Sequence, residues 1–322
     1  MDNPEKCPLC ASVKLQLGLS KHGTFTLEKC KNCGVRFWWP LEFAGKAFYD
    51  IAEFNAAYTD KEAPIYWRER QFLENPPLQS GRLLEIGFGK GRFLQEAQKL
   101  GFDVWGVDVS QKAYCIAKQF YKLEHIFNEN FLTFAGRANI GTFDVVCFFE
   151  VLEHQADPIG FLSLVSRLLR PGGRIAFSVP DLERVGGPEK DKAEFPPNHP
   201  FQYGEKGLAA LLSRGGFSME KVAREPFSKD YFFQDGGTLR FGFMSFLREK
   251  LFLFREAGSP ESRNIEILDQ EQNQRNIPWR MFMFIARVWK IVATLFLFPV
   301  VLIMRLSGRT WWDMYGLAKK RS

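Results

Sequence analysis

Four cysteines near the start of the sequence stand in two closely spaced pairs. Each pair reads Cys-x-x-Cys, and 19 residues separate the pairs. Two such pairs supply four thiolates from two tight turns, which suits a tetrahedral zinc ion with sulfur atoms about 2.3 Å from the metal. We therefore expect a structural zinc site; reduced free thiols or a redox pair are the alternatives. The expected ligands are Cys7, Cys10, Cys30 and Cys33.

A glycine-rich turn, LLEIGFGKGRFL, occupies residues 83–94. Glycines permit a tight turn and let a ligand approach the amides at a helix N-terminus. A dinucleotide fingerprint, GxGxxG, would require glycine at position 92, where arginine stands. Glu85, before the turn, suits a cationic ligand, and Asp108, roughly 20 residues beyond it, can hold a ribose diol. The pattern predicts a nucleoside site; an incidental strand–helix turn is the alternative.

The chain has only four histidines, the residue type best suited to remove a proton near neutral pH. His154 follows an expected strand, where open α/β sheets bind ligands. His199 stands in a proline-rich loop before an expected helix. We expect His199 or His154 to act as a general base or to contact the substrate, with local architecture and loop packing as the alternatives. His22 is expected to be a bystander, and His125, in an expected strand, to be structural.

The elements that must position these residues alternate between 81 and 226. Short apolar runs predict strands and longer amphipathic runs predict helices, which indicates a mostly parallel sheet with helices on both faces. The expected strands are 82–86, 103–108, 124–127, 143–148, 174–180 and 218–223, with a last strand at 311–318. The expected helices are 91–100, 110–121, 158–169 and 205–214.

Four successive segments carry a family resemblance: LLEIGFGKG, VWGVDVS, FDVVCFFEVLEH and LLRPGGRIAFSVP. Their order and spacing resemble the motif series of class I S-adenosylmethionine (SAM)-dependent methyltransferases. The front end, CPLC…CKNCGVRFWWP, is similar to that of members with an N-terminal zinc ribbon. The resemblance implies an α/β fold with a Rossmann-like seven-stranded methyltransferase sheet, an N-terminal zinc ribbon and an apolar helical insertion near the C-terminus.

The resemblance also implies which residues hold SAM. Asp108 would take the ribose hydroxyls, Glu129 or Asn130 would lie beside adenine, and Phe149 and Glu150 would flank the sulfonium. The family's usual Gly-Asp reads Asn128-Glu129 here. The residues that would line the methionine and ribose portion are Glu85, Gly87, Gly89 and Gly91.

The net charge of +6 is unevenly distributed. Residues 279–322 hold eight basic residues and one acidic residue, so the rest of the chain carries −1. Phosphate binding needs basic residues arrayed across a working face, so this distribution argues against a nucleic-acid partner. Within 281–304, Arg287 and Lys290 interrupt a strongly apolar run.

A membrane span needs about 20 residues with few or no charges. A basic stripe opposite apolar residues is typical of a helix lying in a membrane surface. We therefore expect membrane contact through 279–306; core or oligomer packing and a true span are the alternatives.

We divide the chain into five regions. They are a zinc ribbon (1–40), a helical linker or cap (41–80), the SAM-binding core (81–226), a Phe-rich helical insertion (227–310), and a final strand with a basic tail (311–322).

The expected function is SAM-dependent methyl transfer to a small or lipid- or glycan-linked acceptor, at an oxygen. An RNA methyltransferase that uses the ribbon for recognition is one alternative, and a non-catalytic membrane-associated protein with a degenerate fold is another. No secretory leader pattern is visible. We therefore expect a cytoplasmic protein, with a peripheral position on the inner face of the membrane as an extension. The oligomeric state is left open.

Overall fold

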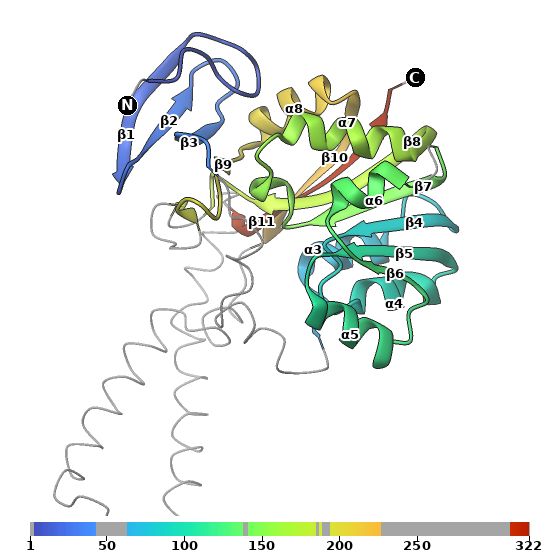
Figure 1. Cartoon of the computed structure of the whole chain (residues 1–322). Helices are drawn as coiled ribbons and strands as arrows, with labels where there is room; N and C mark the ends of the chain where they lie inside the picture. Colours follow the sequence, from blue (N-terminus) through green and yellow to red (C-terminus); the bar gives the residue numbers. More distant parts are fainter. Residues whose placement is uncertain are drawn as a thin grey trace, which may run out of the picture. The chain divides into compact units, whose positions relative to one another are not determined.

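The computed structural model describes residues 3–42, 63–137, 141–184, 187–188, 194–226 and 310–321 (Figure 1). The chain divides into two compact units, one made of residues 1–225 and 310–322 and the other of 226–309. Apart from Pro226, the described residues belong to the first unit. Their strands form two sheets, one of seven strands and one of four.

The seven-stranded sheet has the order β10-β11-β8-β7-β4-β5-β6. The pairs β4–β5, β5–β6, β4–β7 and β7–β8 are parallel, and β11 is antiparallel to β8. Strand order reverses between β4 and β7, where a sheet of this kind binds its ligand beyond the carboxyl ends of the strands. The strands are β4 (Gly81–Ile86), β5 (Phe102–Asp108), β6 (His125–Asn128), β7 (Phe143–Phe149), β8 (Leu169–Pro180), β10 (Phe217–Pro226) and β11 (Thr310–Lys320).

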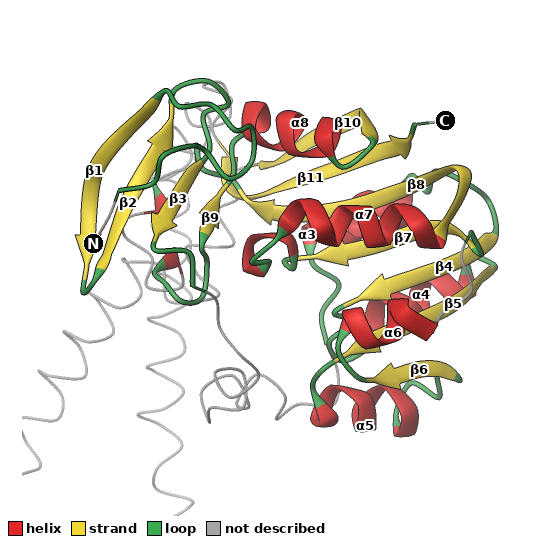
Figure 2. Cartoon of the chain, turned by 45° about the horizontal axis from the view of Figure 1, so that its top comes forward, coloured by secondary structure: helices red, strands yellow, loops and turns green. Residues whose placement is uncertain are grey.

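Helices cover both faces of this sheet (Figure 2). Side chains of β4 alternate between two buried clusters, with Leu83 in one and Leu84 in the other, as the twofold period of a strand requires. A short 3-10 helix, η1 (Leu152–His154), follows β7. One cluster includes α3 (Trp67–Glu74), α4 (Arg92–Lys99) and α5 (Gln111–Gln119), and the other includes α6 (Phe131–Arg137), α7 (Pro158–Leu168) and α8 (Glu205–Arg214).

Local sequence explains where these helices begin. The Ser110 hydroxyl accepts a hydrogen bond from the Ala113 N–H at 3.3 Å and caps α5. The Asp157 carboxylate accepts from the Gly160 N–H at 2.9 Å and caps α7. Pro158 then occupies the first turn of α7, where its missing N–H costs nothing.

The second sheet has the order β1-β2-β3-β9, and all its pairs are antiparallel. Its first three strands belong to residues 3–42, which we call the ribbon. Its fourth strand comes from the segment between β8 and α8. The strands are β1 (Leu15–His22), β2 (Phe25–Cys30), β3 (Arg36–Trp39) and β9 (Phe201–Gln202).

The expected α/β fold with a seven-stranded sheet is confirmed, and β11 supplies the expected last strand. β8 begins earlier than expected, at Leu169 instead of 174. The reason is that Leu169 pairs with Phe143 ahead of a register shift, after which Arg174 pairs with Val145.

Other expectations reach beyond the described residues. Of the helical stretch expected over 41–80, the structure describes α3, and residues 43–62 lie outside the described part. The expected insertion also lies outside it, apart from Thr310. None of the described helices is long and apolar enough to cross a membrane.

Candidate cofactor, acceptor and metal sites

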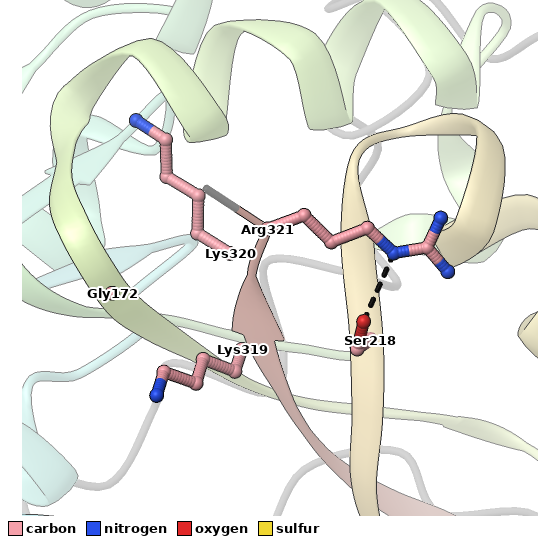
Figure 3. A pocket seen from close by; sticks show the side chains of 5 residues that line it. All are labelled: Gly172, Ser218, Lys319, Lys320 and Arg321. Atoms are coloured by element: carbon pink, nitrogen blue, oxygen red, sulfur yellow. Dashed lines mark hydrogen bonds between the residues drawn. The ribbon is translucent and has the colours of Figure 1, made fainter.

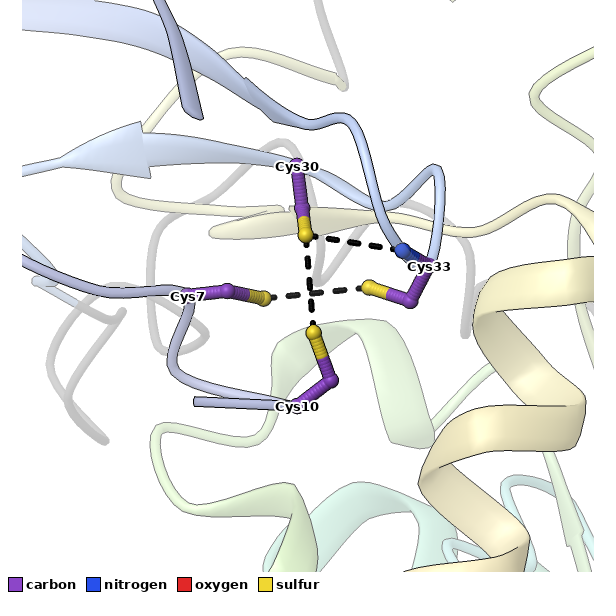
Figure 4. Close-up of side chains that lie close together, drawn as sticks. All are labelled: Cys7, Cys10, Cys30 and Cys33. Atoms are coloured by element: carbon purple, nitrogen blue, oxygen red, sulfur yellow. Dashed lines mark hydrogen bonds between the residues drawn. The ribbon is translucent and has the colours of Figure 1, made fainter. Parts of the chain in front are cut away.

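The four expected zinc ligands point toward one another in the ribbon (Figure 4). Their sulfur atoms all lie within 4.8 Å of one another. The Cys7 and Cys33 sulfurs are 3.7 Å apart, and those of Cys10 and Cys30 are 3.5 Å apart. A tetrahedron with metal–sulfur bonds of about 2.3 Å has edges of about 3.8 Å. The residues and their spacing therefore fit a zinc ion.

The surroundings of the sulfurs act on the thiols in opposite directions: the hydrogen bond with Cys7 and burial raise the pKa of Cys33, and burial raises the pKa of Cys30. The hydrogen bond with Cys33 lowers the pKa of the Cys7 thiol to about 5. The Cys33 N–H lies 3.5 Å from the Cys30 sulfur, and the Asn32 side-chain amide lies 3.6 Å from the Cys10 sulfur. Donors aimed at sulfur stabilise the charged form that binds a metal.

The glycine-rich turn after β4 has the left-handed backbone that glycine favours. Gly87, Gly89 and Gly91 have φ values of 75°, 53° and 86°. A Cβ atom at Gly91 would lie 2.8 Å from Leu123 Cδ1, so this glycine serves the packing of α4. At Gly89 a Cβ would meet nothing within 4 Å among the described atoms, and the Gly89 N–H donates to Asp108 Oδ2 at 2.9 Å. The turn thus ties the end of β4 to the end of β5.

Two buried carboxyl groups lie at the ends of these neighbouring strands. Burial raises the pKa of Asp108 to about 6, although the N–H groups of Ser110 and Gly89 donate to it. Burial raises the pKa of Glu85 well above its usual range, and the negative charges of Glu69 and Asp108 raise it further. Glu85 is 3 % exposed, and its Oε2 has no hydrogen-bond partner within the described part of the chain. Such a group is suited to a ligand that brings positive charge and donors.

Glu150, just after β7, has an unusual backbone conformation for a non-glycine residue, with φ of 55°. Its Oε1 accepts from the Ser178 hydroxyl at 2.8 Å. Burial raises the pKa of Glu150 to about 8, with a further rise from Asp313 and an opposing effect from Arg68. Strained residues of this kind concentrate at functional sites.

Two histidines expected from the sequence come together near η1. The rings of His154 and His199 are 4.5 Å apart at 71°. The pKa of His154 falls to about 3 because burial and the neighbouring His199 disfavour its charged form. His154 Nδ1 lies 2.9 Å from the Asn198 carbonyl oxygen, which can only accept, so Nδ1 carries the hydrogen.

His199 faces a carboxylate. Its Nδ1 is 3.4 Å from Glu194 Oε2, and Arg184 Nη2 lies 2.8 Å from Glu194 Oε1. Burial alone would raise the pKa of Glu194, but its contacts with His199 and Arg184 outweigh burial and lower it. A carboxylate on one ring nitrogen directs the other nitrogen toward proton transfer.

Glu153 completes a cluster that could also hold a divalent cation. One ligand atom each from Glu153, His154 and His199 lie within 4.8 Å of one another. Both Glu153 carboxyl oxygens are buried without a hydrogen-bond partner among the residues described. Burial, followed by the charge of Glu150, raises the pKa of Glu153 well above its usual range.

A family model described as a methyltransferase domain matches residues 57–222, just over half of the chain. The chain belongs to the methyltransferase-domain family. Within this domain, the expected residues Glu85, Gly87, Gly89, Asp108, Phe149 and Glu150 lie at or just beyond the carboxyl ends of β4, β5 and β7.

Curated relatives match the methyltransferase domain over part of their length. A ubiquinone biosynthesis O-methyltransferase from Aromatoleum aromaticum is 30% identical over 144 residues, 42% of this chain and 58% of that protein. The one from Colwellia psychrerythraea is 37% identical over 149 residues, 44% of this chain and 58% of that protein. The chain therefore spans less than two thirds of the length of these relatives.

Solved structures give a more distant likeness. A SAM-dependent methyltransferase from Archaeoglobus fulgidus has a TM-score of 0.46 at 15% identity, covering 78% of this chain and 92% of that one. One from Mesorhizobium loti has a TM-score of 0.45 at 15% identity, covering 79% and 98%.

Two residues expected beside adenine have partners elsewhere in the methyltransferase domain. Asn130 Oδ1 accepts from the Thr133 N–H at 2.8 Å at the start of α6. Glu129 forms an ion pair with Arg137. An adenine contact by either residue stays a prediction. To make it, the side chain would have to leave its present partner, or the contact would have to come from the backbone.

Several charged residues that lie near the carboxyl ends of the parallel strands were not predicted from the sequence. Glu153 could have been predicted, because it stands in the same Glu-Val-Leu-Glu-His segment as Glu150 and His154. Arg68, from α3, pairs with Asp313 at the start of β11 at 2.8 Å. No sequence signal links these two residues, because 245 positions separate them.

A hollow of about 590 Å³ lies near the start of β8, at the end of the sheet opposite the carboxyl ends of β4, β5 and β7 (Figure 3). Two of its three basic side chains, those of Lys320 and Arg321, form hydrogen bonds within the fold. Lys320 Nζ donates to the Ser166 and Leu169 carbonyls, and Arg321 Nε donates to the Ser218 hydroxyl. Lys320 thus supports the end of α7, and Arg321, which also contacts Ser213, supports the end of α8.

Glu150→Gln is expected to stabilise the cofactor-free protein much more at pH 8 than at pH 5. The folded pKa is about 8, whereas an unfolded chain holds a glutamate near about 4.3. Between these values the folded state keeps a proton that the unfolded state has released. The free energy of unfolding therefore falls as pH rises through this window. Glutamine retains an acceptor for Ser178 and removes the titration.

We expect a gain of about 1 kcal/mol or more at pH 8, seen as a rise in thermal midpoint of roughly 2–4 °C. Glu220→Gln is the matched control, since Glu220 pairs with Arg174 in a more exposed position. An effect of Glu150→Gln that is equal at pH 5 and pH 8 would contradict the prediction.

Proposed function

We propose that the chain is a SAM-dependent methyltransferase that methylates an oxygen of a small-molecule or lipid-linked acceptor, such as a glycan intermediate. The observation that carries the proposal is the pair of buried carboxyl groups, Glu85 and Asp108, joined by the glycine turn. Glu85 has an oxygen without a partner among the described residues, which suits a cationic group, and Asp108 ends β5, where a carboxylate can accept from a ribose diol. The name of the relatives, O-methyltransferase, supports an oxygen acceptor.

When bound, SAM supplies a methyl group on a positively charged sulfur that is transferred by in-line displacement. Glu85 and the backbone of Gly87 and Gly89 would hold its methionine and ribose portion. Phe149, which packs on Phe93 with ring centroids 5.0 Å apart, would help to exclude water beside the sulfur, and Glu150 would lie next to it.

His199 would remove the acceptor proton in this scheme. Its Nδ1–H would point at Glu194, which leaves Nε2 to take the proton from the acceptor hydroxyl as the oxygen attacks the methyl carbon. His154, whose pKa of about 3 makes it a weak base, would orient the acceptor or His199. We further propose that the four cysteines hold one structural zinc ion.

Residues 279–306 would bind a membrane surface and so bring the enzyme to an acceptor that lies there. Support comes from the amphipathic sequence of this segment and from its connections to the sheet. The Asp313 N–H of β11 lies 3.4 Å from Glu225 Oε2 of β10. The segment between these two strands therefore begins and ends at neighbouring points of the sheet. The full chain is expected to float with anionic liposomes and a variant lacking 227–306 to sediment. Sedimentation of both would contradict membrane contact and the inner-face location.

S-adenosylhomocysteine, the product of methyl transfer, is the probe for the cofactor site. Calorimetric titration should show binding to the wild type, weakened about 100-fold in Asp108→Ala, because two hydrogen bonds to a charged group are lost. The ribose hydroxyls would donate to ionised Asp108, so affinity should fall as pH drops below about 6. Absence of binding to the wild type would leave the proposed function without its cofactor.

A further inference from the structure

The ribbon is joined to the segment that carries His199. β9 has two residues, and its strand partner in the second sheet is β3 of the ribbon. Arg36 pairs with Gln202 and Phe37 with Phe201. The Trp38 N–H donates to the Pro200 carbonyl at 3.0 Å, which places a ribbon hydrogen bond directly beside His199. β3 and β9 lie side by side in both overall views (Figures 1 and 2).

The Trp38 side chain makes a second connection on the other side of His199. Trp38 is 2 % exposed, and its indole N–H donates to the Glu194 carbonyl at 3.1 Å. Phe195 packs against this indole at 5.8 Å and stacks on His22 of the ribbon at 4.5 Å. Ribbon contacts therefore hold both Glu194 and Pro200, and His199 lies between them in the chain.

Glu194 links the ribbon to the His199 side chain. Its carboxylate is fixed by Arg184, and the side chains of the pair are 2% and 3% exposed. The same carboxylate faces His199 Nδ1 at 3.4 Å. A shift of the Glu194 backbone would therefore move the group that orients the imidazole.

The cysteine cluster lies immediately before β3. Cys33 precedes Val35 by two residues, and the Cys30 N–H donates to the Val35 carbonyl at 2.9 Å. The first cysteine turn is tied to α8, because Arg214 donates to the Leu9 carbonyl. A unit of about 40 residues rarely buries enough apolar surface to fold without a metal or disulfides. We therefore expect the order of β3 to depend on a metal at the four cysteines as well as on its pairing with β9.

We propose that the ribbon, when it holds zinc, clamps residues 194–203 and so positions His199, with Trp38 as the positioning residue. The consequence for catalysis rests on the function proposed above, whereas the clamp itself can be measured without an acceptor. In this role the ribbon binds a segment of its own chain, whereas the alternative hypothesis has it bind RNA.

Hydrogen exchange of the full chain, read by mass spectrometry, tests the clamp. The samples are the wild type, the wild type stripped of zinc by a chelator, the stripped protein after zinc is restored, Trp38→Phe, and Leu19→Ala. Trp38→Phe removes the indole N–H and keeps an aromatic ring. Leu19→Ala is the matched control, because Leu19 is exposed on β1 and 38% accessible.

Stripping zinc or introducing Trp38→Phe should speed exchange in 194–203 about tenfold or more, the size of effect expected from one lost buried hydrogen bond. Carbethoxylation of His199 by diethyl pyrocarbonate should rise several-fold, while exposed His125 on β6 stays unchanged. Exchange in 81–108 should not change, and returning zinc should restore the stripped protein.

Unchanged exchange in 194–203 after zinc removal would overturn the proposal. An equal rise in 194–203 and 81–108 would also overturn it, because that result means general destabilisation. S-adenosylhomocysteine affinity, measured on the same samples, separates the two proposals. No binding to the wild type refutes the proposed function, whereas the exchange data alone decide the clamp.

Discussion

Replacing His199 with alanine is expected to lower methyl transfer by about 100- to 10,000-fold, the usual contribution of a general base. His199 is buried beside Glu194 and His154, and its Nδ1 faces the Glu194 carboxylate. An acceptor oxygen that keeps its proton is a poor nucleophile, so losing the imidazole slows the chemical step. The proposed cofactor site lies at the ends of β4 and β5, away from His199, so S-adenosylhomocysteine should bind with unchanged affinity.

The measurement is turnover with radiolabelled SAM at saturating acceptor, alongside calorimetry. His125→Ala is the matched control, because His125 lies in β6 at the edge of the sheet, where it stacks on Trp105 of β5. His154→Ala should have a smaller effect than His199→Ala, since the pKa of His154 is about 3. Unchanged turnover in His199→Ala would remove this residue from the mechanism.

Cys33→Ser is expected to abolish zinc binding, from one ion per chain to none. Cys33 is buried, and its sulfur lies 3.7 Å from that of Cys7. Structural zinc in small zinc-dependent domains is held with an apparent free energy of about 10–16 kcal/mol, much of which is folding free energy. Removal of one ligand should therefore unfold the ribbon as well as release the ion.

Metal analysis of the purified protein measures the stoichiometry, and Cys115→Ser is the matched control. Cys115 lies in α5, outside the cluster, so that variant should retain one zinc. His199→Ala should also retain one. Zinc retained in Cys33→Ser would contradict the four-cysteine site, and metal lost in His199→Ala would place an ion at Glu153, His154 and His199.

Local patterns were sufficient to predict much of the fold. Each Cys-x-x-Cys pair brings two sulfurs together because its turn is short, and strand–helix alternation predicted the succession of elements between 81 and 226, except for α6, η1 and β9. The glycine turn was predictable because its left-handed backbone is a requirement of a few neighbouring residues. β8 began earlier than expected, because pairing with β7 extends it across Pro171 and two glycines.

Contacts between distant residues could not be predicted in this way. Trp38 and Glu194 are 156 positions apart, and neither local sequence indicates the other. The contact depends on the path of the segment after β8 and on the docking of the ribbon. The placement of His199 beside His154, 45 positions earlier, is likewise tertiary, although each histidine could be singled out by residue type and by its position after a strand or in a loop.

Methyl transfer itself tests the central claim most directly. The full chain is incubated with SAM labelled in its methyl group and with membrane and soluble extracts of the organism that makes it. We predict label in an acceptor molecule as a base-stable methyl ether, with S-adenosylhomocysteine as the co-product and incorporation at background in Asp108→Ala. Incorporation by the wild type no greater than by Asp108→Ala in every extract would contradict the assignment of this chain as a SAM-dependent methyltransferase.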